Sequence, residues 1–204
     1  MAQSSDAELV IAARGDGLIN KVINGLQDIG CIFYSLSFGT ANVFCRKINV
    51  PLNPLYAISM MNLKDLYNIN LGKIEIRYFI QMTGFGFDAT VVKNLNSTLK
   101  KINGKAAHLI PGIRTLLIDK FNGLNLIIDS KRLLVYHIIV SLGNKYAGNF
   151  NLSQLNKSDG KFLVCSQRAN KKSLLLYNIV SIATNKEFGL NQGFHDNIKI
   201  EGTK

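Results

Sequence analysis

Long hydrophobic runs are scarce in this sequence, which argues against a membrane-spanning helix. The longest apolar stretches, Leu133 to Leu142 and Leu174 to Thr184, contain about ten residues each, whereas a helix needs roughly 20 to cross a bilayer. The start, Met1 to Glu8, is polar and has neither a basic n-region nor an apolar h-region. Because secretory signals and transit peptides need such regions, we expect a cytoplasmic protein without a transmembrane segment.

Cysteine and histidine are also rare, with three of each among 204 residues. Cys31, Cys45 and Cys165 are odd in number, widely spaced, and lie within or beside apolar segments. This pattern is typical of buried reduced thiols rather than of a disulfide framework. The histidines show no ligand spacing with one another or with the cysteines, so a zinc site is not expected.

Acidic residues are few in the second part of the chain. Residues 1–92 hold 7 Lys+Arg and 7 Asp+Glu, and residues 93–204 hold 17 and 6, so the second part carries the whole net charge of +11. A basic surface there can face anionic lipid, nucleic acid or nucleotide phosphates, or be a solvated face without a ligand. No nucleic-acid recognition motif or basic stripe interleaved with aromatics is present, so a nucleic-acid partner is not expected.

The first fifty residues alternate between strand and helix patterns. Glu8 to Ala13 predicts a short buried strand, the turn Arg14 to Gly17 follows, and apolar residues at helical spacing then predict a helix through Leu26. Cys31 to Leu36 predicts the next strand, and Ser37 to Asn42 a second polar turn that opens a short helix. Both turns follow strands, so we expect them close together at one edge of one sheet.

Strand patterns dominate beyond residue 50, where two prolines punctuate the chain. The predicted strands are Lys73 to Met82, Leu124 to Asp129, Leu133 to Leu142 and Lys161 to Ser166, and the predicted helices are Ala89 to Lys101, Ala106 to Phe121 and Lys172 to Asn185. The sequence thus predicts an α/β plus β fold, with an incomplete α/β layer in residues 1–50 and a β-rich region with helices in residues 51–204. A parallel sheet needs both faces covered, so further strands are expected before Met1.

A Gly-rich turn between a strand and a helix can bind phosphate. Its backbone N–H groups point outward, glycine permits close approach, and the helix amino terminus adds positive potential. Taken alone, the turn Arg14 to Gly17 is equally typical of simple chain reversal.

The wider context is more specific. Val10 to Leu26 resembles the Gly-Gly-Asp-Gly-Thr-x-Asn-Glu-Val-x-Asn-Gly block of the diacylglycerol kinase catalytic family, which groups diacylglycerol- and sphingosine-type lipid kinases. Phe38 to Phe44 follows at the family's spacing and is similar to its Pro-x-Gly-Thr-x-Asn-Asp-Phe block. The resemblance covers nearly the whole chain and continues through Tyr78 to Ile80, Gly84 to Ala89, Lys100 to Lys105 and Asp159-Gly160.

The resemblance implies a two-domain lipid kinase that transfers a phosphoryl group from ATP to a lipid hydroxyl of the diacylglycerol or sphingoid type. Residues 1–50 would be a partial nucleotide-binding α/β domain. Residues 51–204 would be a β-rich, sandwich-like domain that presents the lipid substrate at the membrane surface. The residues implied to bind ATP are Gly15, Asp16, Gly17, Asn20 and Thr40.

The family also implies a structural Mg²⁺. Its ligands would be Asn156, Asp159 and Lys161, the aspartate through its carboxylate and the other two through backbone oxygens. Oxygen ligands are what Mg²⁺ requires. Without the family, Asp159-Gly160 would be interpreted as a plain β-turn.

Four positions depart from the family pattern: Arg14 replaces its first glycine, Leu18 its threonine, Lys21 its glutamate and Ser37 its proline. Arg14 matters most, because it adds a side chain where backbone approaches phosphate, and a positive φ there would be costly. The alternative is that the Arg14 guanidinium binds phosphate itself. We favour damage over this compensation.

Two further family features are expected to lie outside the chain. The family's first strand-helix-strand unit would precede Glu8, and its Asp-Gly-Glu block, whose carboxylates resemble a base for the lipid hydroxyl, would follow Ile200. We therefore assign no catalytic residue and expect an impaired lipid kinase, since general-base help is typically worth about 10²- to 10⁴-fold. The alternatives are a non-catalytic pseudokinase, or half of a split gene whose second chain supplies missing segments. An NAD kinase-type enzyme is disfavoured by the Gly-Thr-x-Asn and Gly-x-Asp-Ala segments.

Overall fold

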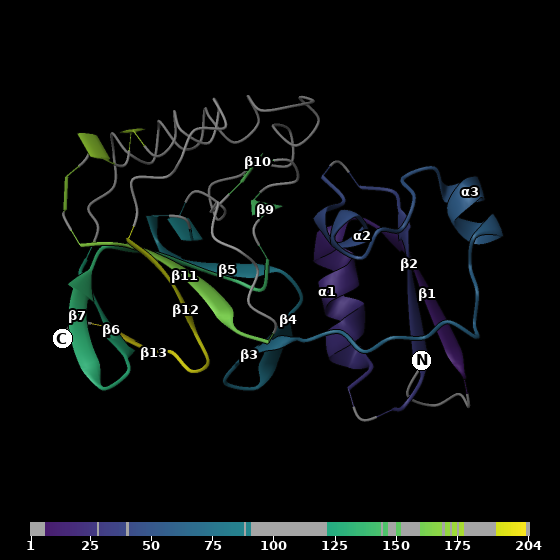
Figure 1. Cartoon of the computed structure of the whole chain (residues 1–204), viewed down its shortest axis with the longest axis horizontal. Coiled ribbons are helices and arrows are strands. Elements are labelled where there is room, and N and C mark those ends of the chain that lie inside the picture. Colours follow the sequence, from purple (N-terminus) through teal and green to yellow (C-terminus); the bar gives the residue numbers. More distant parts are fainter. Residues whose placement is uncertain are drawn as a thin grey trace. The chain divides into compact units, whose positions relative to one another are not determined.

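The computed structural model describes residues 7–27, 29–39, 41–87, 89–90, 122–143, 145–146, 150–151, 160–168, 170–171, 173–174, 176–177 and 191–202. These residues form two compact units, and the change from one to the other falls between Gln81 and Met82 (Figure 1). The predicted domain boundary after residue 50 stays a prediction. Within the ranges above, no helix combines the length and the apolar character needed to cross a membrane.

A parallel strand pair forms the centre of the first unit. β1 (Leu9–Arg14) pairs with β2 (Ile32–Ser37), and α1 (Asp16–Gly25) connects them. Two short helices follow, α2 (Val43–Lys47) and α3 (Pro54–Ser59). Figure 1 shows α1 and α3 on opposite sides of the two strands, so helices cover both faces as a parallel sheet requires.

Side chains alternate along β1 and β2 and so define these two faces. On one face, the Ser35 hydroxyl lies 3.2 Å from the Cys45 Sγ of α2. On the other face, the Tyr34 hydroxyl donates a 2.7 Å hydrogen bond to the carbonyl of Ala57 in α3. Every second residue of β2, counted from Ser35, therefore stands on the face that α2 covers.

The core of this unit is formed by side chains of β1, α1 and α2 together with Ile80. Ile19 and Ile23 are buried one helical turn apart, the spacing that gives a helix one apolar face. Full burial of such a side chain contributes roughly 1.5–3 kcal/mol. The buried cluster consists of Ala12, Ile19, Ile23, Phe44, Cys45 and Ile80.

A hairpin ends the first unit. β3 (Gly72–Ile74) pairs antiparallel with β4 (Arg77–Phe79), and β5 (Met82–Gly86) then opens the second unit. The single strand predicted from Lys73 to Met82 is therefore wrong. The chain reverses at Glu75, whose φ is +51°, and no residue typical of turns announces this reversal.

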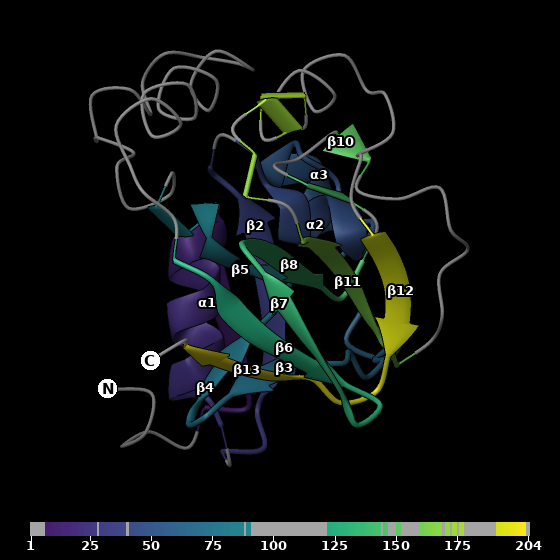
Figure 2. The same ribbon diagram turned by 90° about the vertical axis from the view of Figure 1, so that its left-hand side faces the viewer.

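The second unit contains a four-stranded antiparallel sheet (Figure 2). Its strands are, in spatial order, β12 (Asn191–His195), β11 (Phe162–Gln167), β8 (His137–Ser141) and β5. β8 lies between two neighbours, and all five of its residues are buried. The predicted strands Leu124 to Asp129 and Lys161 to Ser166 are present, the first as β6 and the second as β11.

A three-stranded antiparallel sheet accompanies it, in the order β13 (Lys199–Gly202), β6 (Leu124–Ile128) and β7 (Lys131–Val135). A further pair is formed by β9 (Lys145–Tyr146) and β10 (Phe150–Asn151). The single strand predicted from Leu133 to Leu142 is wrong. The chain changes sheets at Tyr136, whose N–H donates a 2.9 Å bond to the Gln167 carbonyl of β11.

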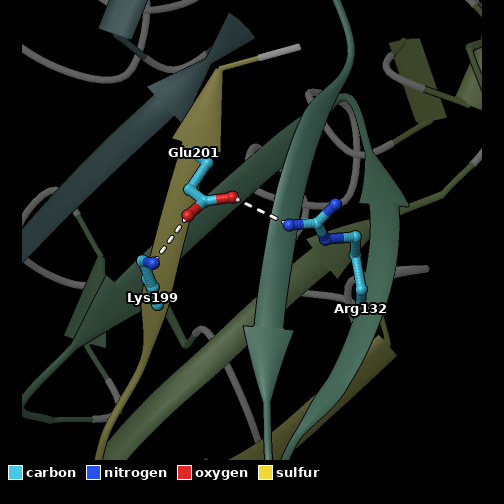
Figure 3. Close-up of polar contacts among 3 residues, drawn as sticks. All are labelled: Arg132, Lys199 and Glu201. Carbon is cyan, nitrogen blue, oxygen red and sulfur yellow. Dashed lines mark hydrogen bonds and ion pairs between the residues drawn. The ribbon is translucent and has the colours of Figure 1, made fainter.

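Glu201 on β13 lies between two cations (Figure 3). Its carboxylate pairs with Lys199 at 2.7 Å and with Arg132 of β7 at 3.1 Å. The hydrogen bond and the charge of Lys199, followed by the charge of Arg132, lower the pKa of Glu201. The cluster thus links the two outer strands of this sheet across β6.

Cys45 and Cys165 are buried free thiols, as predicted, whereas Cys31 is a half-buried free thiol. Burial raises the pKa of Cys165 to about 12. Of the helix predicted from Ala89, the structure describes two residues, which are helical, and the rest lies outside the described residues together with the helix Ala106 to Phe121. The described part of the helix Lys172 to Asn185 is Ser173, Leu174, Leu176 and Tyr177, all helical.

Candidate phosphate-binding site

The two Gly turns of the first unit meet at the carboxyl ends of β1 and β2. A Cβ on Gly15 would lie 3.1 Å from the Gly39 Cα, and a Cβ on Gly39 would overlap Gly15 and lie 2.8 Å from the Asn42 Oδ1. Neither glycine has a positive φ. Close approach of two backbones, rather than a special backbone conformation, therefore requires glycine at position 39 and favours it at position 15. The predicted proximity of the turns is confirmed.

The Asp16 carboxylate fastens the start of α2 to the start of α1. Its Oδ2 accepts a 3.1 Å hydrogen bond from the N–H of Val43, and its Oδ1 accepts a 2.9 Å bond from the N–H of Phe44. Gln81 adds a 2.9 Å bond from Nε2 to the same Oδ1. Asp16, implied by the family to line ATP, thus uses two of its described hydrogen bonds to hold the start of α2 and the third to bind Gln81.

Asn42 holds the second turn. Its Oδ1 accepts a 2.8 Å bond from the N–H of Gly39, and its Nδ2 donates a 2.8 Å bond to the Gly39 carbonyl. Its backbone is left-handed, with φ +47°, a conformation that asparagine tolerates better than most residues. Thr40, the implied ATP residue of this turn, lies outside the described residues.

The amino terminus of α1 is open. Gly15 is its N-cap, and no side chain caps the helix. The N–H groups of a helix's first turn have no intrahelical acceptor and, with the helix dipole, attract anions. Gly17 is exposed in this turn, and a Cβ there would meet nothing within 4 Å. A phosphate can therefore approach the backbone closely.

Two buried polar atoms in this region have no hydrogen-bond partner among the residues that the structure describes. They are the Oδ1 of Asn20 and the Oγ of Ser37. Since buried polar groups almost always have a partner, each of these atoms is available to a bound ligand. Asn20 is one of the residues implied to bind ATP, and its Oδ1 can accept a hydrogen bond or bind a cation.

Arg14 is the last residue of β1, and its side chain is exposed. Arg14 is not among the described residues with positive φ, so the cost of such a φ does not arise here. The arginine therefore fits the strand without backbone strain.

Only one of the three predicted magnesium ligands, Lys161, lies within the described residues. Lys161 directly precedes β11, and its Nζ lies 3.5 Å from the Asp196 Oδ2, while Asn156 and Asp159 lie outside the described residues. Within the ranges that the structure describes, no group of three His, Cys, Asp or Glu side chains is placed to hold a metal ion. The three-residue magnesium set stays a prediction.

Two residues of the site were not foreseen. The amide of Asn24 pairs with the backbone of Tyr78 in both directions at 2.7 Å and also donates a 2.8 Å bond to the Asn20 carbonyl. Asn24 lies in the family block, so the sequence marked its position without indicating what it contacts. Nothing in the sequence marked Gln81, because its partner Asp16 is 65 positions away.

Comparison with known proteins identifies the family. The family described as "Diacylglycerol kinase catalytic domain" matches residues 1–74. A diacylglycerol kinase of Staphylococcus haemolyticus is 30% identical over 183 residues, 85% of this chain and 54% of that protein. A probable YegS-like lipid kinase of Pseudomonas putida is 33% identical over 106 residues, 51% of this chain and 36% of that protein.

Solved structures agree. The crystal structure of a putative diacylglycerol kinase from Bacillus anthracis matches with a TM-score of 0.75 and 19% identity, covering all of this chain and 68% of that one. The fold is thus a mixed α/β fold shared with diacylglycerol kinases. Together, the match of residues 1–74, the relatives and the shared fold support the diacylglycerol kinase catalytic-domain family for this chain. The chain spans about half the length of the Staphylococcus haemolyticus relative.

Proposed function

We propose that this chain is a lipid kinase-like protein whose first unit binds ATP at the edge where β1 and β2 end. The reaction of the complete machinery is phosphoryl transfer from ATP to a lipid hydroxyl of the diacylglycerol or sphingoid type. The observation that carries the proposal is the packing of Gly15 against Gly39 beside the uncapped amino terminus of α1. An open helix terminus with backbone N–H groups suits a phosphate group.

In this proposal Gly15, Gly17 and Asn20 contact the phosphates, and Asp16 acts by positioning. Its three hydrogen bonds set the start of α2 against the start of α1. Thr40 completes the second nucleotide turn. Displacement of either turn by about 1 Å would lower the rate, since orientation contributes heavily to catalysis.

The second unit would present the lipid. Exposed basic side chains favour an anionic membrane surface, where each Lys or Arg near the surface contributes about 1 kcal/mol. The described ones are Lys131, Arg132, Lys161, Arg168, Lys171 and Lys199. Mg²⁺, which kinases use to neutralise phosphate charge, would be held by Asn156, Asp159 and Lys161.

We further propose that the isolated chain transfers phosphoryl groups poorly. The Asp16 carboxylate stands at the phosphate edge but already accepts three hydrogen bonds. Three of its roughly four lone-pair positions are therefore occupied, which makes it a weaker base for the lipid hydroxyl, and general-base help is worth about 10²- to 10⁴-fold. This engagement of Asp16 also favours a second candidate, a pseudokinase that binds ATP without turnover.

A second chain remains part of the proposal. The Staphylococcus haemolyticus relative is nearly twice as long as the segment matched here, since the match covers 54% of it. A partner that carries the remaining family segments would complete the kinase. Restored turnover on co-expression with the neighbouring reading frames would support this arrangement.

The experiment measures ATP binding by isothermal titration calorimetry with Mg²⁺, and turnover with radiolabelled ATP and mixed micelles of diacylglycerol or ceramide. We expect saturable ATP binding and turnover well below about 1 s⁻¹, the low end of ordinary enzyme rates. Absence of ATP binding by the folded chain would refute the nucleotide site. Turnover near 1 s⁻¹ would refute the impaired state.

Gly17→Ala provides the site variant. Its methyl group has room but covers the N–H groups that would contact phosphate, so ATP affinity should fall several-fold. Gly25→Ala, at the other end of α1 and equally unobstructed, is the matched control and should bind ATP like the wild type.

A further inference from the structure

Arg14 and Ser37 are the two residues that close the parallel ladder. They are Cα partners in the register of β1 and β2. Residues in register on parallel strands point to the same face, and for this row it is the face that carries Ser35, beside α2. The two side chains therefore stand next to each other at the phosphate edge, one residue before the turn that contains Gly15.

Both side chains have unused binding capacity. Ser37 is 7% exposed, and its Oγ has no hydrogen-bond partner among the described residues. Arg14 is exposed and makes no hydrogen bond or ion pair with any other described residue. Asp16, the nearest acidic residue along the chain, points its charge at Val43, Phe44 and Gln81 instead. A buried hydroxyl and a free guanidinium thus remain side by side.

We propose that Arg14 and Ser37 form a paired contact for one phosphate group of the bound nucleotide. This inference rests on the proposed ATP site and adds two side chains to its backbone cradle. The guanidinium supplies a planar pair of N–H donors that matches two phosphate oxygens. The buried Ser37 hydroxyl at the end of β2 supplies a further donor, and α1 supplies the N–H groups of its first turn.

The pairing also explains why the two departures from the family pattern occur together. Arg14 stands where the family has glycine, and Ser37 stands where it has proline. Glycine and proline side chains donate no hydrogen bond, so the family pattern leaves this row without side-chain donors. In this chain the same pair of strand positions carries the Arg14 guanidinium beside the Ser37 hydroxyl. The two changes therefore both add a hydrogen-bond donor at the end of the β1–β2 pair.

The test is calorimetric titration of the full chain with ATP, tripolyphosphate and adenosine, for the wild type, Arg14→Ala, Ser37→Ala and the double variant. A charge-assisted contact predicts about a tenfold loss of affinity for ATP and tripolyphosphate in Arg14→Ala, and a smaller loss in Ser37→Ala. The double variant should lose less than the product of the two, because neighbours in one contact are not additive. Adenosine binding should not change.

Arg77→Ala is the matched control, since Arg77 is an exposed arginine of the same unit on β4. It removes the same charge and should leave the affinities unchanged. Arg14→Lys, which keeps the charge and loses the planar fork, should give an intermediate affinity and serves also if Arg14→Ala does not fold.

The outcomes separate the two proposals. If the wild type binds ATP and tripolyphosphate and Arg14→Ala binds them equally well, the paired contact is wrong and the nucleotide site stands. If tripolyphosphate binds through Arg14 but ATP does not bind, the nucleotide site is wrong, and with it the assignment of the pair to a nucleotide phosphate. If the wild type binds neither, both are overturned.

Discussion

Asp16 and Gln81 lie 65 positions apart in the sequence, yet the Gln81 Nε2 donates a 2.9 Å hydrogen bond to the Asp16 Oδ1. Asp16 opens α1, and Gln81 ends the long segment Met1–Gln81 of the first unit. The same carboxylate accepts the N–H groups of Val43 and Phe44. The geometry of the phosphate edge therefore depends on a residue from the far end of the unit.

Replacing Asp16 by asparagine should destabilise the protein. The substitution leaves one acceptor oxygen and places an NH₂ group opposite a backbone N–H of α2, so a donor faces a donor. Loss of a hydrogen bond to a charged group, with a donor left unsatisfied, typically costs about 1–3 kcal/mol. Urea denaturation measures the difference. Asp65→Asn, an exposed acidic site in the same unit, is the control, and equal midpoints for both variants would contradict the positioning role.

Gly39→Ala should be destabilising, because its methyl group would overlap Gly15. Forcing atoms into a packed contact typically costs about 1–3 kcal/mol, and the two turns should separate. Gly25→Ala, whose Cβ meets nothing within 4 Å, should stabilise α1 by up to about 1 kcal/mol. Thermal unfolding compares the two variants, and a Gly39→Ala protein as stable as the wild type would show that the turns do not pack closely.

Asn24→Asp tests the pairing of α1 with β4. The carboxylate keeps an acceptor for the Tyr78 N–H but turns oxygen toward the carbonyls of Tyr78 and Asn20, where Nδ2 now donates. We expect a loss of about 1–3 kcal/mol and faster hydrogen exchange of the Tyr78 amide. Asn68→Asp, at an exposed position, should change neither quantity. Unchanged exchange at Tyr78 in Asn24→Asp would contradict the pairing.

Glu201 should titrate below its ordinary pKa of 4.5. A carboxyl group whose pKa is lowered by folding contributes stability above its unfolded pKa and loses it as the pH falls through the folded value. Stability should therefore fall slightly as the pH drops below 4.5, and less so in Glu201→Gln. Carboxyl NMR titration measures the pKa directly. Lys199→Ala should raise it more than Arg132→Ala, since Lys199 is the larger cause, and a pKa of Glu201 unchanged in Lys199→Ala would exclude this cause.

The sequence predicted the first unit well up to its second turn. Local patterns carry that part, because β1, α1 and β2 each follow from apolar spacing and from glycines at the turns. It failed where tertiary structure decides. An unbroken apolar run hid the change of sheet at Tyr136, and the turn at Glu75 uses a positive φ without glycine or asparagine.

The candidate site shows the same division. Gly15, Gly17 and Asn20 were identified from a local block, and the structure brings the first of them to Gly39. The engagement of Asp16 was not visible, because its partners come from α2 and from Gln81. The strand conformation of Arg14 could not be inferred from the family's glycine, and the close approach of backbones falls at the next position, between Gly15 and Gly39.

The family match ends at residue 74, but the physical unit continues to Gln81. Residues 75–81 contain the Tyr78 backbone that pairs with Asn24, the buried core residue Ile80, and the Gln81 amide. A truncation at residue 74 would separate β3 from β4 and remove Ile80 from the core. For recombinant work, a cut before Gln81 would therefore disrupt the first unit.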